Sequence, residues 1–137
     1  MMNRREVHVE WGDCDPAGIV YFPRFFEFFD ACTAALFERA GFRKAEMLQQ
    51  FNLLGIPMVD TRAQFHAPVA FGETVTVESE IIEWGRTSFT VRHKMYKGKE
   101  LAAEGSEKRV WTVRDAQAKH GIRSEPIPQG VKDRFRD

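Results

Sequence analysis

A short segment near the start of the chain holds the side chains best suited to chemistry. Asp13, Cys14 and Asp15 follow one another and are succeeded by a Pro-Ala-Gly run. A carboxylate can serve as a general base or as a nucleophile, and a cysteine becomes a nucleophile when its thiol is deprotonated. Because Asp, Pro and Gly all favour turns, we expect these residues to lie in a structured loop.

Each of these three side chains also has a structural interpretation. Asp15 can accept a hydrogen bond from its own loop in an Asx turn, and turn chemistry alone favours that role. We expect Asp13 to serve the local backbone, since a metal site would need a third clustered ligand that the sequence does not show. Cys14 is expected to be a small loop residue, because no group that would activate its thiol can be identified.

The elements around the loop predict a fold of the α+β class. Alternating apolar and polar residues predict a strand at 5–11 that ends before the loop. After the loop, apolar residues cover most of the wheel of a helix expected at 24–40, with Pro23 suited to its first turn and Gly41 to its C-terminal cap. Such a helix must be wrapped by other elements. A shorter helix is expected at 44–51.

Strands make up most of the remaining chain. Period-two alternation separated by tight turns predicts consecutive antiparallel hairpins, and a sheet of this kind buries one face. We expect that face to curl around the long helix. The strands are expected at 58–65, 74–84, 88–96 and 100–113, with a bulge at Gly105.

Length and composition narrow the class of protein. The 137 residues predict one domain, in which 126–137 form a loosely attached tail or a short helix. Twenty Lys+Arg balance twenty Asp+Glu, so the charge favours neither nucleic acid nor an anionic membrane as a partner. No apolar stretch reaches the roughly 20 residues of a membrane-spanning helix. Cys14 and Cys32 are expected to be free thiols in a reducing, cytoplasmic setting, because no secretory leader is visible.

Three sequence runs resemble one known family. The run WGDCDPAGIVYFP at 11–23, followed by the aromatic helix, resembles the 4-hydroxybenzoyl-CoA thioesterase family of hot-dog proteins. The resemblance continues through GIP at 55–57, the strand that ends at Phe65 and EWGRTSF at 83–89, and covers most of the chain to about Val113. It implies a five-stranded antiparallel sheet wrapped around a central helix, dimers joined by a continuous sheet, and homotetramers. The implied activity is hydrolysis of an acyl-CoA, with coenzyme A as part of the substrate and no separate cofactor.

The resemblance also implies roles for individual residues near the helix. Asp15 matches the catalytic aspartate of the family, as a nucleophile or a general base, and the backbone N–H of Phe22 matches the group that polarises the substrate carbonyl. This pairing suits a thioester, because its thiolate leaves readily and a helix N-terminus stabilises charge on the carbonyl oxygen. Asp30 matches the position that contacts the 4-hydroxyl of a benzoyl ring. An equally good alternative for Asp30 is a carboxylate facing solvent or a dimer interface.

The phosphates of coenzyme A require nearby cations that form charge-assisted hydrogen bonds. Arg86 is the expected contact, although the family has a more basic turn at this place. Ser88 is the matching hydrogen-bonding residue, and Arg62 is a candidate replacement for the missing charge. For each of the three, an ordinary exposed position in a turn or strand is the alternative.

Two other functions are compatible with the same residues. A hot-dog dehydratase would place a histidine beside a carboxylate, and no histidine accompanies Asp15 in the sequence. A non-catalytic acyl-CoA-binding module would bind the thioester without releasing a thiol. The four histidines show no metal-ligand spacing, and we expect them to be structural: His8, His66, His93 and His120.

Overall fold

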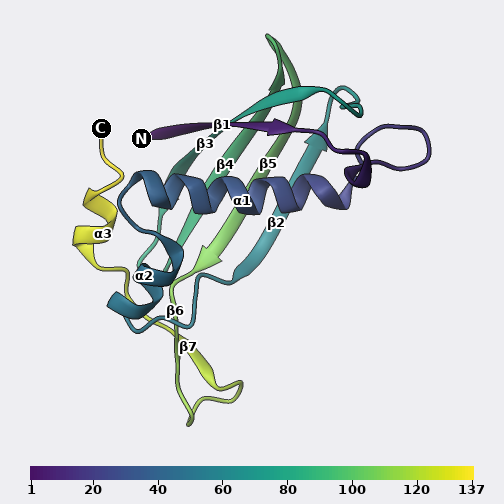
Figure 1. The fold of residues 1–137 in the computed structure, drawn as a ribbon. Helices are drawn as coiled ribbons and strands as arrows, with labels where there is room; N and C mark the ends of the chain where they lie inside the picture. Colours follow the sequence, from purple (N-terminus) through teal and green to yellow (C-terminus); the bar gives the residue numbers. More distant parts are fainter.

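A five-stranded antiparallel sheet curls around one long helix in the computed structural model, which describes residues 1–137 (Figure 1). The strand order is β1-β3-β4-β5-β2, and a two-stranded hairpin of β6 and β7 projects from one end. The hot-dog fold expected from the sequence is therefore confirmed. The elements are β1 (Met2–His8), α1 (Pro23–Arg39), α2 (Lys44–Gln50), β2 (Met58–Phe65), β3 (Thr74–Trp84), β4 (Ser88–Lys97), β5 (Glu100–Val110), β6 (Thr112–Arg114), β7 (Ile122–Ser124) and α3 (Gln129–Asp133), with a 3-10 turn at Trp11–Asp13.

The long helix α1 is held by apolar side chains at helical spacing. Phe25, Phe29, Cys32 and Leu36 lie on one side of the helix and are buried against the sheet. Full burial of a side chain such as Phe or Leu contributes about 1.5–3 kcal/mol. The helix ends where expected, since Gly41 has φ +98°, a left-handed conformation that glycine adopts without strain. None of the helices combines the length and the apolar character needed to cross a membrane.

Gly105 allows α1 to approach the sheet closely. The predicted bulge at this residue is wrong: Gly105 pairs regularly with His93, and the register between β4 and β5 shifts between Met95 and Tyr96 instead. A Cβ atom added at Gly105 would lie 2.5 Å from the ring of Phe29. The glycine is thus explained by helix–sheet packing rather than by a kink in the strand.

The first strand lies earlier in the sequence than predicted. β1 pairs with β3 from Met2↔Glu80 to His8↔Thr74, and the pairing stops where β3 begins. Trp11 therefore lies outside the strand, and its side chain is 62% exposed, packing edge-to-face on Phe71. The apolar alternation that predicted a strand to residue 11 continued into the loop without a partner strand to pair with.

The C-terminal segment is part of the core. Ile127, Val131 and Phe135 are buried in the same apolar cluster as Phe37 and Trp111. The prediction of a loosely attached tail is therefore wrong, and the short-helix alternative is what forms. The amino group of Met1 donates to the carbonyl of Phe135, so the two termini lie side by side (Figure 1).

Candidate active site

The loop between β1 and α1 folds back on itself and carries Asp15 close to the start of the helix. Cys14 and Val20 form an antiparallel bridge, and the Asp15 N–H donates to the Ile19 carbonyl at 2.9 Å. Tyr21 N–H donates to the Asp13 carbonyl, also at 2.9 Å. These bonds fix Asp15 opposite the residues that lead directly into α1.

The carboxylate of Asp15 is only partly engaged by its own loop. Oδ1 accepts a hydrogen bond from the Ala17 N–H at 2.9 Å, which is the Asx turn that turn chemistry predicts. Oδ2 makes no hydrogen bond within the chain, and the residue is half-buried. The turn therefore orients the carboxylate and leaves one oxygen available for chemistry.

A free backbone donor lies at the start of α1. Phe22 is the N-cap residue, and its N–H donates to no acceptor within the chain, while Pro23 has no N–H to offer. An unpaired amide at this end of a helix adds its own dipole to the positive end of the helix dipole. The Phe22 N–H is thus suited to stabilise negative charge on a substrate oxygen.

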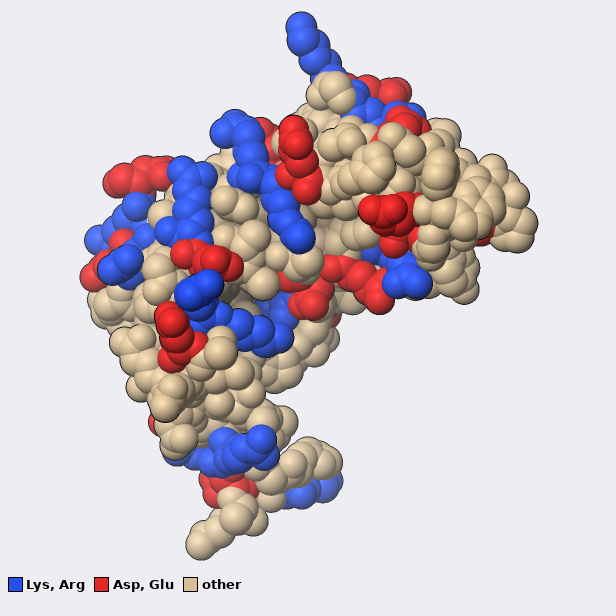
Figure 2. Space-filling model, viewed as in Figure 1, with Lys and Arg blue, Asp and Glu red and all other residues tan.

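An apolar groove adjoins this donor. Its volume is about 300 Å³, and seven of its nine lining residues are hydrophobic, among them Ile19, Phe22, Phe25 and Phe65. The end of the molecule formed by the loop before α1 shows few charged side chains in Figure 2. The surroundings of Phe22 can therefore accept an uncharged acyl chain or ring.

The other two chemical groups of the loop have local roles. Asp13 Oδ2 accepts a hydrogen bond from the Glu10 N–H at 2.9 Å, as expected for a backbone-capping residue. Burial and the charges of Asp13 and Asp15 raise the pKa of the Cys14 thiol, which reduces its thiolate fraction at neutral pH. No group of three or more His, Cys, Asp or Glu residues could hold a metal ion.

The residues predicted to contact the coenzyme A phosphates lie away from Asp15 within one chain. Arg86 and Ser88 lie at the turn that joins β3 to β4. The Asp15 loop reaches the opposite end of β3, because the Val9 N–H donates to the Glu73 carbonyl. β3 spans 11 residues, or about 36 Å at the usual rise of a strand. A single chain does not bring these residues together.

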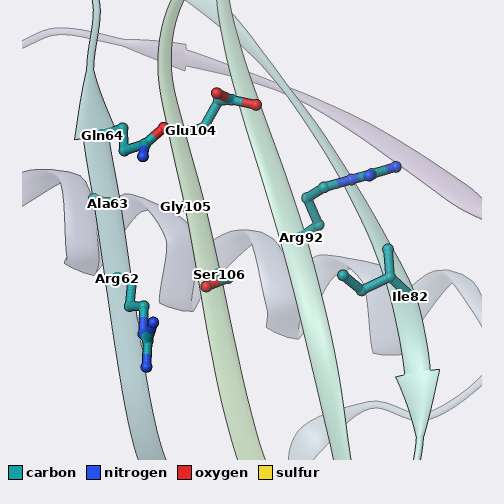
Figure 3. Close-up of a pocket in the computed structure, with 8 residues that line it drawn as sticks. All are labelled: Arg62, Ala63, Gln64, Ile82, Arg92, Glu104, Gly105 and Ser106. Carbon is teal, nitrogen blue, oxygen red and sulfur yellow. The ribbon is translucent and has the colours of Figure 1, made fainter.

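Arg62 lies on the outer face of the sheet. It lines a hollow of about 260 Å³ together with Arg92 and Ser106, and α1 runs behind the strands on the opposite face (Figure 3). Two hydrogen bonds, at 3.0 and 3.2 Å, pair its guanidinium with Asp60. Arg62 therefore lies on the face of the sheet opposite α1.

Asp30 lies midway along α1 and reaches toward β5. Its side chain is 61% exposed, and Oδ1 accepts a hydrogen bond from Arg109 at 2.7 Å. Both residues line a cavity of about 70 Å³ that α2 helps to close, with Phe42 and Met47 among its apolar walls. Asp30 is therefore a paired carboxylate at the edge of a cavity.

Behind Asp30 lies a buried polar network that the sequence reasoning missed. Glu107 is 1% exposed and contacts Thr33, His93 and Arg109. Burial raises the pKa of the Glu107 carboxyl, but hydrogen bonding and the charges of His93 and Arg109 outweigh burial and hold the pKa below its usual value. The sequence feature that could have predicted this network is the two-residue period of β5. This period places Glu107 and Arg109 on the same face of the strand as the buried Gly105.

The family follows from comparison with known proteins. Residues 9–135 match the family model of the thioesterase-like superfamily. The chain belongs to this superfamily. It is 31% identical to the 4-hydroxybenzoyl-CoA thioesterase of Pseudomonas sp. (strain CBS-3) over 120 residues. This alignment covers 83% of this chain and 85% of that relative. Because the superfamily and its similar members are thioesterases, this chain is a thioester hydrolase.

Solved structures of thioesterases share the whole fold. The structure of the Pseudomonas sp. strain CBS-3 enzyme matches with a TM-score of 0.87 and 27% identity, covering 97% of this chain and 98% of that one. A gentisyl-coenzyme A thioesterase matches with a TM-score of 0.82 and 32% identity, also over 97% of this chain and 98% of the other. The superfamily fold thus spans nearly the entire chain.

Proposed function

We propose that this thioesterase hydrolyses an aromatic acyl-CoA of the 4-hydroxybenzoyl type to the free acid and coenzyme A. One observation carries the proposal: a carboxylate oxygen of Asp15 without a partner lies in the loop that leads to an unpaired N–H at the start of a buried helix. A similar solved structure is an aspartate-to-asparagine variant of 4-hydroxybenzoyl-CoA thioesterase in complex with 4-hydroxybenzoyl-CoA. Its bound thioester supports a role for an aspartate in the reaction.

The reaction needs only these two groups from the chain. The substrate carbonyl oxygen accepts a hydrogen bond from the Phe22 N–H, which makes the carbonyl carbon more electrophilic. Asp15 Oδ2 then attacks that carbon, the C–S bond breaks, coenzyme A leaves as the thiolate, and water hydrolyses the resulting acyl anhydride. Alternatively, Asp15 takes a proton from water, and the hydroxide attacks the carbon directly.

The position of Asp30 supports an aromatic acyl group. It lies eight residues after Phe22, about 12 Å along the axis of the helix. Helical side chains lean toward the N-terminus, which shortens the distance to be spanned. A carbonyl at Phe22 and a hydroxyl across a benzene ring fit this spacing better than a short alkyl chain does. Two relatives are named as thioesterases of 4-hydroxybenzoyl-CoA and gentisyl-coenzyme A, which are CoA thioesters of hydroxylated aromatic acids.

We further propose a homodimer formed through β2. This strand pairs only with β5, so the backbone N–H and C=O groups of its other edge have no partner strand, and its Val59 is 59% exposed. A two-fold pairing of β2 strands would continue the sheet and reverse the direction of the second copy. Arg86 of the partner subunit would then lie at the same end as Asp15, close to the phosphates of the substrate. Two such dimers would form the homotetramer expected from the resemblance.

Replacement of Asp15 by Asn tests the proposal. The variant should bind 4-hydroxybenzoyl-CoA, keep the wild-type unfolding curve, and release free thiol orders of magnitude more slowly. Wild-type turnover by Asp15→Asn would remove Asp15 from the mechanism. Saturable binding by the wild type without thiol release would indicate a binding module instead. Formation of a double bond in the acyl chain would indicate a dehydratase.

When aryl- and alkyl-CoA thioesters are compared as substrates, the aromatic thioesters should have the highest kcat/KM. The highest kcat/KM is expected for hydroxylated benzoyl-CoA, because the Asp30 carboxylate is proposed to accept a hydrogen bond from the ring hydroxyl. A panel led by medium-chain alkyl substrates would contradict the aromatic assignment while leaving thioester hydrolysis in place.

A further inference from the structure

Arg109 is unusual among the cations of this chain because it is almost fully buried and contacts two carboxylates. Its side chain is 8% exposed. Nε donates to Glu107 Oε1 at 3.1 Å, and one terminal nitrogen donates to Asp30 Oδ1 at 2.7 Å. The other terminal nitrogen donates to the Ile56 carbonyl at 3.2 Å. All three nitrogens are therefore in use, and the planar guanidinium has one defined orientation.

On the buried side of Arg109, Glu107 belongs to a network of hydrogen bonds that holds it in place. Glu107 accepts a hydrogen bond from the Thr33 hydroxyl, which ties it to α1. His93 lies 3.4 Å from the same Glu107 oxygen, is fully buried, and is held on its other side by Ser79 at 2.7 Å. The ring of His93 also stacks on Phe29. Buried networks of this kind allow little movement of any one member.

On the solvent side of Arg109, Asp30 is free to bind a ligand. Asp30 is mostly exposed, and its Oδ2 has no hydrogen-bond partner within the chain. Without Arg109, a short side chain on the polar strip of a helix would rotate into water. With Arg109, Oδ1 is held in place, and both residues line the same cavity.

We propose that Arg109 is a positioning residue: it holds the Asp30 carboxylate in one orientation, so that this carboxylate accepts a hydrogen bond from a donor on the acyl group. This inference rests on the proposed function and specifies its substrate class. An ionised carboxylate accepts hydrogen bonds and donates none. The site therefore favours a ring with a hydroxyl or amino substituent and disfavours the unsubstituted, methoxy or carboxylate analogue.

The test is the ratio of kcat/KM for 4-hydroxybenzoyl-CoA to that for benzoyl-CoA. A hydrogen bond to a charged group corresponds to a ratio of roughly tenfold to a hundredfold in the wild type. In Arg109→Met the ratio should fall to near one, mainly through KM, and Arg109→Lys should give an intermediate ratio. Asp30→Asn should lower the ratio as well, and the double variant Asp30→Asn/Arg109→Met should lower it no further, because the two residues act as one unit.

Arg4→Met is the matched control. Arg4 also donates to a carboxylate at 2.7 Å, but this partner is Glu78 on a different part of the sheet. Its removal should leave the ratio at the wild-type value. If Arg109→Met does not fold, Arg109→Lys and Asp30→Asn decide the question, since Asp30 is exposed and its replacement leaves the core intact.

Two outcomes would overturn the inference. One is a wild-type ratio near one, and the other is a loss of activity in the Arg109 variants that is equal for both substrates, as expected of a merely structural residue. Failure of the proposed function is recognised separately, because the wild type would then hydrolyse neither thioester. Calorimetric binding of the two thioesters would in that case measure the same ratio, and a hydroxyl preference independent of Arg109 would reject the positioning role.

Discussion

The ring of Phe29 on α1 lies directly against Gly105 on β5, in the space that any side chain at residue 105 would occupy. This contact sets the distance between the helix and the sheet. The same helix carries the Phe22 N–H at its start and Asp30 at its middle. The packing of Phe29 on Gly105 therefore determines where both groups lie relative to the inner face of the sheet.

Replacement of Gly105 by Ala should destabilise the protein. The added methyl group would overlap the Phe29 ring, and overpacking of this kind costs about 1–3 kcal/mol. Denaturant unfolding should show a lower midpoint with little change in slope. Gly130→Ala is the control, because a Cβ there meets no atom within 4 Å and the residue lies in α3. Equal midpoints for Gly105→Ala and the wild type would contradict this packing.

Removal of one backbone donor should slow the reaction. Phe22 has a backbone φ of −52°, close to the φ that the proline ring imposes. Phe22→Pro would therefore remove the N–H while the backbone φ is kept. Loss of one such donor lowers kcat by about 10²–10³-fold. Phe22→Ala retains the N–H and serves as the control for loss of the ring. If both variants lose activity to the same extent, the amide is not the polarising group.

Stability should fall in acid because of Glu107. Its pKa is held below the ordinary value of 4.5, so its contribution is fully present above pH 4.5 and is lost as the pH falls through the lowered pKa. Unfolding midpoints of the wild type and Glu107→Gln should therefore converge below about pH 4.5. A difference that stays constant from neutral pH to pH 3 would show that the carboxylate is not ionised in the folded protein.

The two cysteines should react with thiol reagents at different rates. Cys32 is fully buried, and burial raises its pKa to about 11, so its thiol is protonated and shielded at neutral pH. Cys14 is half-buried and is accessible from the loop. A colorimetric thiol reagent should label one cysteine in the native state and two in denaturant. Cys14→Ser should remove the native reaction, and rapid labelling of this variant would be unexpected.

A charge on the open edge of β2 should prevent dimerisation. Val59→Lys places an ammonium group on the edge that we propose to pair between subunits, and charged edges resist pairing. Light scattering should then give the mass of a monomer. Thiol release should also decrease, since the partner subunit's Arg86 would no longer reach the substrate. A control with lysine at exposed Ile122, on β7, should retain the wild-type mass.

Much of the sheet was predictable, because 74–84 and 88–96 show clear period-two alternation and mark two neighbouring strands. The predicted bounds of 58–65 and 74–84 are those of β2 and β3. The buried network was not predictable in the same way. Glu107 and Arg109 look like ordinary polar residues until the pairing with β4 and the position of α1 decide which face of β5 is buried.

The candidate site was predictable only in part for a related reason. Asp15 and Phe22 are near each other in the sequence, so local structure suffices to bring them together. Arg86 and Ser88 lie at the opposite end of β3 from the Asp15 loop, and this separation depends on strand pairing, which leaves no local pattern in the sequence. Burial of Ile127, Val131 and Phe135 was likewise obscured by the charges and prolines between them.

The contact between Met1 and Phe135 makes the chain nearly circular. A short linker could join the two ends, and new ends could be opened in the exposed turn between β6 and β7, around residues 116–120. Such a circular permutant should keep the loop of Asp15 at the far end of the molecule intact. For the same reason, an affinity tag or a surface attachment at Met1 or Asp137 would leave that loop accessible to substrate.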